Sequence, residues 1–184
     1  MVSYRGDSTV MASELHVDAI KHSGGTSAMT IDSTGRVLTP ARPAFRATIA
    51  GSSSSHGDQG VLIFETEDFD IGGNYDHTNG TFTAPIAGIY HFMFRSLTAT
   101  TSGGVASNDG DVVFADIQKN GSNVSGTRAY SYFASAGAHH ATLMINQILQ
   151  LSATDTIRIN VGQEFVYSDT NAQNDPTFQG YLIG

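Results

Sequence analysis

The sequence predicts an all-β protein built as a sandwich or barrel of antiparallel strands. In many segments an apolar side chain recurs at every second position, which is the period of a strand whose successive side chains point to opposite faces of a sheet. Gly, Asn, Asp and Ser separate these segments at short intervals, and no segment carries a useful helical period. About ten short strands divided by such turns are typical of a sandwich or a barrel.

The clearest strand covers residues 88–98. Its alternation predicts one aromatic face, with Tyr90, Phe92 and Phe94, and a second face, with Ile89, His91 and Met93. A strand at the surface of a lone monomer should be apolar on one face and polar on the other. Since the second face is not properly polar, we expect either a thick domain or another subunit to cover it.

The other expected strands follow in order along the chain. Asn79-Gly80 favours a tight type I′ hairpin turn within residues 75–84, because both residues tolerate a positive φ. Asn120-Gly121 marks a second hairpin. Polar loops are expected at 51–60, 99–110 and 168–176. The remaining strands are expected at 44–50, 61–64, 111–118, 122–130, 141–151, 156–161 and 178–183.

Eight positions around the aromatic strand have a specific spacing. They are Phe64, Asp70, Tyr75, Phe82, Gly88, Tyr90, Phe92 and Phe94. The set matches without a gap the signature of the complement C1q globular head, and the chain resembles that family over residues 42–184. The resemblance implies a ten-stranded jelly-roll sandwich of the C1q and tumour-necrosis-factor type, which works as a tight homotrimer. We therefore take Ile89, His91, Met93 and Tyr181 as candidate trimer contacts.

The chain is expected to have two parts, an N-terminal segment at 1–41 and the head at 42–184. The segment shows short strands whose apolar stripes are too thin for a core within one chain. Three copies wound together could share one. The stripes consist of Leu15, Val17, Met29, Ile31 and Val37.

Residues 28–45 resemble linkers of bacteriophage structural proteins that precede a C1q-like head. This resemblance implies a virion protein of a tailed phage, assembled in the host cytoplasm, with the N-terminal stripes attached to other virion proteins. The expected function is recognition of a host surface glycan or protein, as a tail fibre or spike tip. One alternative is a capsid decoration or head-fibre protein at a three-fold position. A second alternative is a secreted C1q-like binding ligand.

Charge and composition exclude several classes of protein. The formal net charge is −8, from 9 basic and 17 acidic residues, so we expect no binding to nucleic acid, which needs clustered Lys and Arg. No run of apolar residues is long enough to span a membrane, and we expect no membrane insertion. The first residues lack the pattern of a secretory signal, and the chain has no cysteine to form a disulfide.

Candidate chemistry is sparse. We find no nucleophile elbow, no zinc-protease motif and no phosphate loop, so the protein is not expected to be an enzyme. No cofactor is expected. The acidic turn at 108–111 has oxygen ligands that could bind calcium weakly. His139-His140 could contribute to a metal site on a trimer axis, although a solvated loop is the preferred interpretation.

Overall fold

The computed structural model describes residues 15–49, 60–100, 111–133, 139–162 and 176–184, and every regular element in these ranges is a strand. The chain divides into two compact units, Met1–Ala41 and Arg42–Gly184. Each unit has its own sheet structure, and the two are described separately below.

The first unit contains a small antiparallel sheet with the order β1-β2-β3. Asp32 organises the turn between β2 and β3. Its Oδ1 accepts the backbone N–H groups of Thr34 at 2.9 Å and of Arg36 at 3.0 Å. A local polar network therefore defines this turn. The strands are β1 (Ala19–Lys21), β2 (Ser27–Ile31) and β3 (Val37–Leu38).

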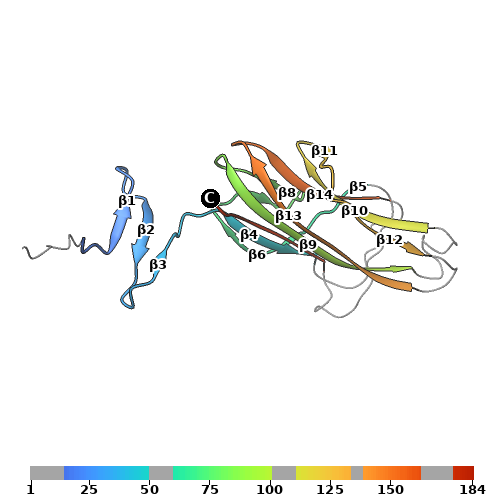
Figure 1. Cartoon of the computed structure of the whole chain (residues 1–184), viewed down its shortest axis with the longest axis horizontal. Helices are drawn as coiled ribbons and strands as arrows, with labels where there is room; N and C mark the ends of the chain where they lie inside the picture. Colours follow the sequence, from blue (N-terminus) through green and yellow to red (C-terminus); the bar gives the residue numbers. More distant parts are fainter. Residues whose placement is uncertain (1–14, 50–59, 101–110, 134–138, 163–175) are drawn as a thin grey trace, which may run out of the picture. The chain divides into compact units, whose positions relative to one another are not determined.

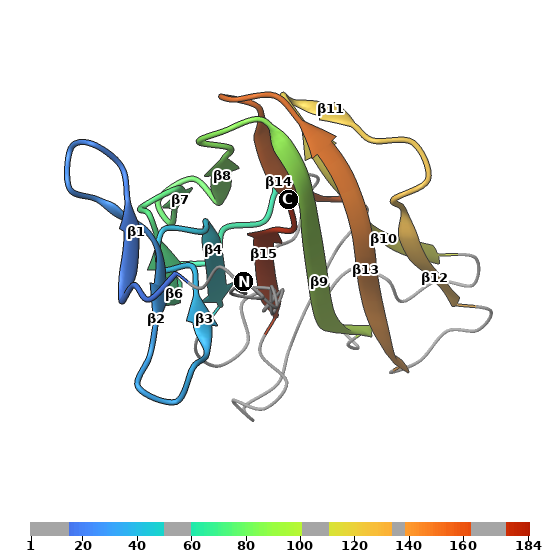
Figure 2. The same cartoon turned by 60° about the vertical axis from the view of Figure 1, so that its left-hand side comes forward.

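The second unit contains a five-stranded antiparallel sheet with the order β13-β9-β15-β4-β6. Its two longest strands, β9 and β13, each have 13 residues and pair along their whole length, and they lie side by side in Figures 1 and 2. The strands are β4 (Ala44–Thr48), β6 (Thr66–Ile71), β9 (Gly88–Thr100), β13 (His139–Leu151) and β15 (Thr177–Leu182).

The facing sheet has the order β11-β10-β14-β8-β7, with β12 paired to β10 and β5 paired to β14. Between β11 and β12 the chain leaves the sheet, and the buried Thr127 anchors it there. The Oγ1 of Thr127 accepts the N–H of Ile117 at 3.1 Å and donates to the carbonyl of Val124 at 2.9 Å. The strands are β5 (Gly60–Val61), β7 (Tyr75–Asp76), β8 (Thr81–Thr83), β10 (Asp111–Lys119), β11 (Ser122–Asn123), β12 (Ala129–Phe133) and β14 (Thr156–Gly162).

Aromatic rings fill the space between the two sheets. Phe45 stacks on Tyr75 with ring centroids 4.8 Å apart and on Phe82 at 5.0 Å. Phe178 meets Phe45 edge-on at 5.0 Å. Gly180 allows this packing, because a Cβ at that position would lie 2.5 Å from Cδ1 of Phe92. The all-β sandwich that the sequence predicts is confirmed.

Two Asn-Gly hairpins show how well the dipeptide predicts the conformation of a turn. Asn120 and Gly121 both have positive φ, 51° and 82°, and they close the two-residue turn between β10 and β11. The expected type I′ turn at Asn79-Gly80 is wrong, because Gly80 has a positive φ and Asn79 does not. There the loop between paired Asp76 and Thr81 is longer, and the carbonyl of Asp76 accepts the N–H of Gly80 at 2.9 Å.

Strand β6 has no counterpart among the expected strands. Its sequence, Thr-Glu-Asp-Phe-Asp-Ile, is rich in acids, which are depleted in strands. It lies at the edge of the five-stranded sheet, where one side of the backbone pairs with β4 and most side chains are exposed. An edge position tolerates charge that a central strand would not.

Candidate subunit interface

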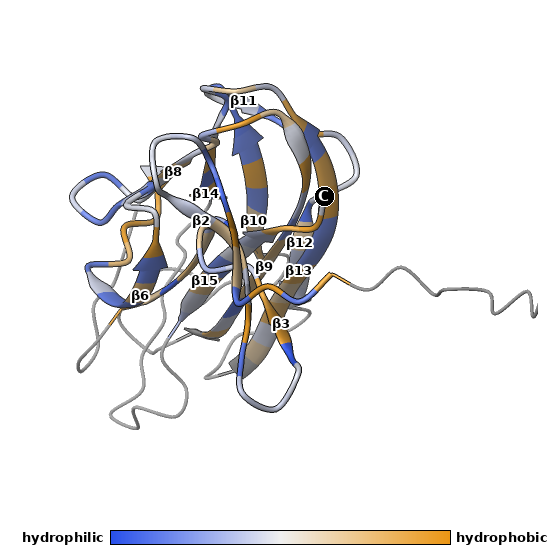
Figure 3. Ribbon diagram, turned by 90° about the vertical axis from the view of Figure 1, so that its left-hand side faces the viewer, coloured by the Kyte–Doolittle hydropathy of each residue, from blue (hydrophilic) through white to orange (hydrophobic). Residues whose placement is uncertain are grey.

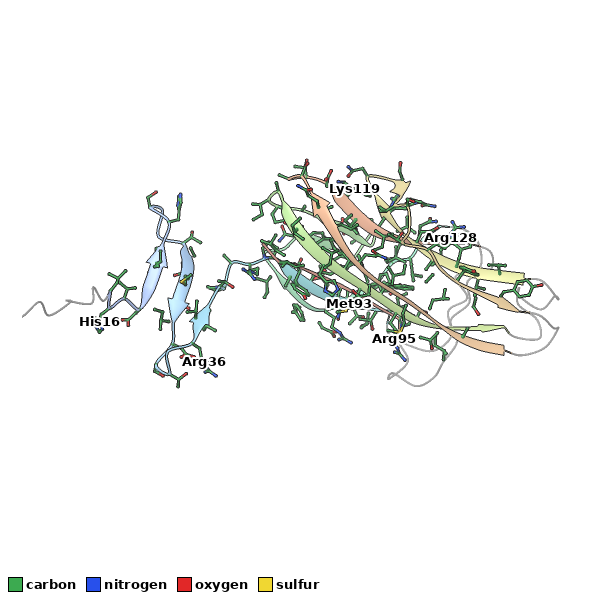
Figure 4. All side chains as sticks on the ribbon, viewed as in Figure 1. His16, Arg36, Met93, Arg95, Lys119 and Arg128 are labelled. Carbon is green, nitrogen blue, oxygen red and sulfur yellow. The ribbon has the colours of Figure 1, made fainter. Side chains whose placement is uncertain are left out.

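The strongest candidate site is the side of the five-stranded sheet that faces away from the aromatic core, here called the outer face. On β9, Tyr90, Phe92 and Phe94 are fully buried in the core, whereas the intervening residues lie on the outer face and are more exposed. Met93 and Arg95 project from this strand in Figure 4. The alternation that the sequence predicts for β9 is therefore present.

Strand register gathers outer-face residues from five strands into rows. The pairing is antiparallel throughout, so residues opposite one another share a face. One row runs Ile148, His91, Tyr181, Ala44, Ile71. The next row runs Asn146, Met93, Gln179, Arg46, Phe69.

The outer face exposes large apolar side chains. Met144 is 66% exposed, Ile148 62% and Tyr181 43%, and Ile71 and Phe69 are exposed on the same face. Single exposed apolar residues are normal on a protein surface, but a contiguous patch marks an interaction site. The outer face is therefore the candidate interaction surface of the head.

His91 lies in the middle of this face. Its Nε2 is 2.5 Å from Oδ1 of Asn146, and its ring meets that of Tyr181 edge-on, with centroids 5.2 Å apart. Its Nδ1 is buried and has no hydrogen-bond partner among the described residues. Because Asn146 offers an oxygen to Nε2, the proton of a neutral ring belongs on Nε2, which leaves the Nδ1 lone pair unused.

A shallow hollow of about 310 Å³ lies beside His91 on the outer face. Apolar groups from Met93 and Met144 and polar groups from Gln179 and two arginines line it. Gln179 Nε2 lies 3.8 Å from the sulfur of Met93, and Arg46 forms an ion pair with Asp68. The hollow is large enough for one side chain, and its lining combines apolar and polar groups.

Tyr181 and the three β9 residues proposed as trimer contacts, Ile89, His91 and Met93, all lie on the outer face. Sequence reasoning missed Met144 and Ile148 on β13. A signal was present, since Leu143, Met144 and Ile145 are consecutive apolar residues, so both faces of that strand had to be apolar. Only strand order shows that β13 lies directly beside β9.

The family-signature residues lie in or beside the core, away from the outer face. Phe64, Phe82, Phe92 and Phe94 are buried among one another. Burial raises the pKa of both signature tyrosines. The Tyr75 hydroxyl donates to the carbonyl of Phe64 at 3.3 Å, and the Tyr90 hydroxyl donates to that of Ile86 at 2.8 Å.

The two other signature positions have backbone roles. Oδ2 of Asp70 accepts the N–H of Tyr75 at 2.8 Å and so joins the end of β6 to β7. A Cβ at Gly88 would lie 2.6 Å from Leu182 Cδ1 and 3.1 Å from the carbonyl oxygen of Gly184. The C-terminal residues thus approach the start of β9 closely, and a side chain at position 88 would have to displace the end of Leu182.

Two metal sites were considered from the sequence, and the described residues can be searched for the ligands of such a site. No group of three or more His, Asp or Glu side chains gathers there. The calcium candidate at 108–111 lies almost wholly outside the described residues, with only the backbone of Asp111 included, and the side chains of His139 and His140 also lie outside them. Within the same described ranges, no helix is long and apolar enough to cross a bilayer.

The candidate attachment residues of the first unit lie in or next to its small sheet. Leu15, Ile31 and Val37 are exposed, and Val17 and Met29 are half-buried. They do not form a buried core within the described residues 15–41.

Comparison with known proteins finds relatives among animal complement-related proteins. The chain is 26% identical over 142 residues to complement C1q tumor necrosis factor-related protein 3 of Homo sapiens and of Mus musculus, which covers 76% of this chain and 50% of each relative. It is 24% identical over 145 residues to protein 5 of the same group from Rattus norvegicus, which covers 78% of this chain and 54% of the relative. The chain thus spans about half the length of these relatives.

A solved structure shares the fold. The globular domain of zebrafish complement 1qA protein superposes with a TM-score of 0.55 at 16% sequence identity, over 77% of this chain and 98% of that domain. At this identity the likeness establishes the jelly-roll fold alone.

The virion location expected from residues 28–45 is wrong. The relatives are complement-related proteins of animals, and nothing among them indicates a phage particle, a tail fibre or a capsid decoration protein. The physical reason for the error lies in the segment itself. Its Asp-Ser-Thr-Gly-Arg run forms an ordinary β-turn, with Gly35 at a positive φ of 83°, and such turns recur in unrelated β-proteins.

The family assignment rests on most of the chain. The sequence model of the C1q domain matches residues 44–183, from the first strand of the five-stranded sheet to the last. The eight signature residues fall inside this match, and the six aromatic ones are part of the core described above. This chain belongs to the C1q domain family.

Proposed function

We propose that this protein is a secreted C1q-like ligand, a non-enzymatic binding protein that assembles as a homotrimer through the outer face. The observation that carries the proposal is the set of large exposed apolar side chains that strand register brings to one face, Met144, Ile148, Tyr181, Phe69 and Ile71, interspersed with uncharged polar groups and arginines. Membership of the C1q family supports the homotrimer, and the relatives' link to complement C1q and tumour necrosis factor supports the role of a ligand.

Burial of the outer face would stabilise the assembly substantially. Each large apolar side chain that passes from solvent into an interface contributes roughly 1.5–3 kcal/mol. Several such side chains from three copies outweigh the cost of bringing the copies together. The ion pair between Arg46 and Asp68 neutralises one of the cations beside this surface before it is buried.

Closed three-fold symmetry also requires a second surface. In a cyclic trimer the contact is heterologous, so each copy presents two different patches. Strand β12, at the edge of the facing sheet, carries Tyr130 and Tyr132 on its exposed side. We assign these tyrosines to the second patch, and their rings suit the hollow beside Met93 and Met144.

The outer face supports binding rather than catalysis. Its polar groups include amides, arginines, the Thr177 hydroxyl and one histidine, and the ring of that histidine lies against the Asn146 amide and not against a carboxylate. Nucleophilic catalysis needs a nucleophile within reach of a base that a third group orients. No such set lies among the described residues of this face.

Trimer assembly is tested by Ile148→Asp, measured by analytical ultracentrifugation. Ile148 is exposed in a single protomer, so the new carboxylate costs the fold little, but a trimer would bury it without a partner. We expect the variant to sediment as a monomer that keeps the wild-type circular dichroism spectrum. Tyr132→Asp should weaken the trimer as well, and Ser122→Asp, on exposed β11, serves as the matched control.

Ligand activity is tested with the same variants on cultured animal cells. A trimer that binds through several weak sites gains about 10²–10⁴-fold in apparent affinity over a single site. We expect the wild-type trimer to bind the cells and the Ile148→Asp monomer to lose most of that binding. A monomer that binds as tightly as the trimer, or a trimer that binds no cell type, would contradict the proposed function.

A further inference from the structure

Within the described residues 15–41, the small sheet of the first unit has no buried core. None of the described residues 15–41 is buried. Val37 is 58% exposed and Ile20 is 48% exposed, and Ile31 is exposed as well. A sheet of two or three short strands is at best marginally stable in water when no face of it is covered. The unit therefore depends on something that packs against it.

Strand register shows that its apolar side chains share one face. Ile20 on β1 is opposite Met29 on β2, and Ile31 on β2 is opposite Val37 on β3. Met29 and Ile31 are two residues apart on the same strand, so all four side chains point the same way. Figure 3 shows the hydrophobic colouring along β2 and β3. We call this set, Ile20, Met29, Ile31 and Val37, the apolar stripe.

The opposite face is less apolar. Thr30 lies at its centre, opposite Ala19 on β1 and Leu38 on β3. The sheet is thus two-sided, with one strongly hydrophobic surface. Local polar contacts hold its turns in place, because Asp32 accepts from Thr34 and Arg36, and these hydrogen bonds lower the pKa of the Asp32 carboxyl. The turn between β2 and β3 is therefore preorganised, although the sheet as a whole is marginal.

We propose that the apolar stripe packs against the same stripe of two further copies of this chain, which gives the trimer a second three-fold contact. This inference rests on the homotrimer proposed above. Residues 39–43, which include Pro40 and Pro43, link each small sheet to its head by a short and stiff connection. Three copies joined at their heads would hold their small sheets at an effective concentration of about millimolar.

The stripe suits identical copies better than a charged partner. Its four strand positions carry no charge, and the exposed Asp18, whose carbonyl accepts the N–H of Ile31, borders them where β1 begins. Each large apolar side chain buried there contributes roughly 1.5–3 kcal/mol, which is sufficient to order a sheet that is otherwise marginal. Contact with another kind of protein, or with the head of the same chain, is the alternative that the experiment must exclude.

The absence of cysteine allows a direct test in the full chain. Ile31→Cys places one thiol on the apolar stripe, and Thr30→Cys places one on the opposite face of the same strand. Each variant is labelled with pyrene maleimide, and excimer emission is recorded alongside sedimentation. We expect both variants to be trimers and the excimer-to-monomer ratio at position 31 to be several-fold higher than at position 30. Dilution of labelled chains into excess unlabelled chains should remove the excimer signal.

The outcomes separate this inference from the function on which it rests. Trimers without excimer emission at position 31 would overturn the stripe contact and leave the homotrimer intact. Equal excimer emission at both positions would show that the sheets are merely close, and would also overturn it. A monomeric sedimentation coefficient for the unlabelled wild-type chain would remove both proposals.

Discussion

The head and the N-terminal sheet both contain strands in which apolar residues alternate, but these residues are buried in the head and exposed in the small sheet. In the head, alternate residues of β9 point into an aromatic core and are wholly buried, as Tyr90 and Phe92 are. In the small sheet the residues of the apolar stripe alternate in the same way, but none of the described residues 15–41 forms a second layer that buries them. The difference is the presence of a facing sheet.

This comparison shows that periodicity specifies a face and not what covers it. A strand in which apolar residues alternate presents one apolar face. Another sheet or another chain can cover that face, or it can remain in contact with solvent. The head supplies both halves of such a contact, the face and its cover, within one chain. The small sheet and the outer face of the head each supply one half, and we propose that further copies of the chain supply the other.

The largest expected loss of stability comes from a cavity made in the core of the head. Phe92→Ala removes a ring that contacts Phe82 and Phe178 from a fully buried position, and we expect a loss of about 3–5 kcal/mol in the free energy of unfolding. Urea denaturation of the full chain measures it. A loss near zero would mean that the aromatic core is not what stabilises the head.

Overpacking of the same core should have a smaller effect. In Gly180→Ala the new Cβ would lie 2.5 Å from Phe92 and 2.9 Å from Phe45, so the rings must shift, at a cost of about 1–3 kcal/mol. Gly184→Ala is the matched control, because nothing lies within 4 Å of its added Cβ. Equal melting temperatures for the two variants would contradict the close packing.

Stability of the head should also depend on pH through Asp155, which joins two turns. Hydrogen bonds from Lys119 and Asn120 and from the backbone of Ser152 lower the pKa of Asp155 from 3.8 to about 2. Since the folded pKa is the lower one, the contribution is complete above the ordinary value and is lost as the pH falls toward 2.

We expect Asp155→Asn to lower the melting temperature at pH 7 and to differ little from the wild type at pH 2. Differential scanning calorimetry of both proteins at each pH measures this difference. A deficit of the same size at both pH values would show that the charge of Asp155 is not what stabilises the turns.

The smallest effect on the stability of the head is expected from a substitution in the small sheet. Met29→Ala should change the unfolding free energy of the head by less than about 0.5 kcal/mol, because no core of the head contains it and surface substitutions are usually within this range. The variant should instead shift hydrogen exchange of the amides in β2 and β3. A large loss in head stability would show that the two units fold as one.

The local sequence pattern was sufficient to predict much of the fold. The alternation of β9 predicted which residues point into the core, since the direction of a side chain depends on the backbone of its own strand. Asn120-Gly121 predicted its hairpin for the same local reason. The acidic strand β6 escaped prediction because its edge position, and not its composition, makes it a strand.

By itself, then, the sequence determined the class of fold, the family signature and the common face of the three β9 candidates, Ile89, His91 and Met93, while the place of Tyr181 beside His91 came from the pairing of β15 with β9. Only the tertiary structure placed Met144 and Ile148 beside them and joined five strands into one apolar surface. The physical reason is that strand pairing is non-local. Residues 91 and 148 are far apart along the chain and become neighbours only through the register of β9 and β13.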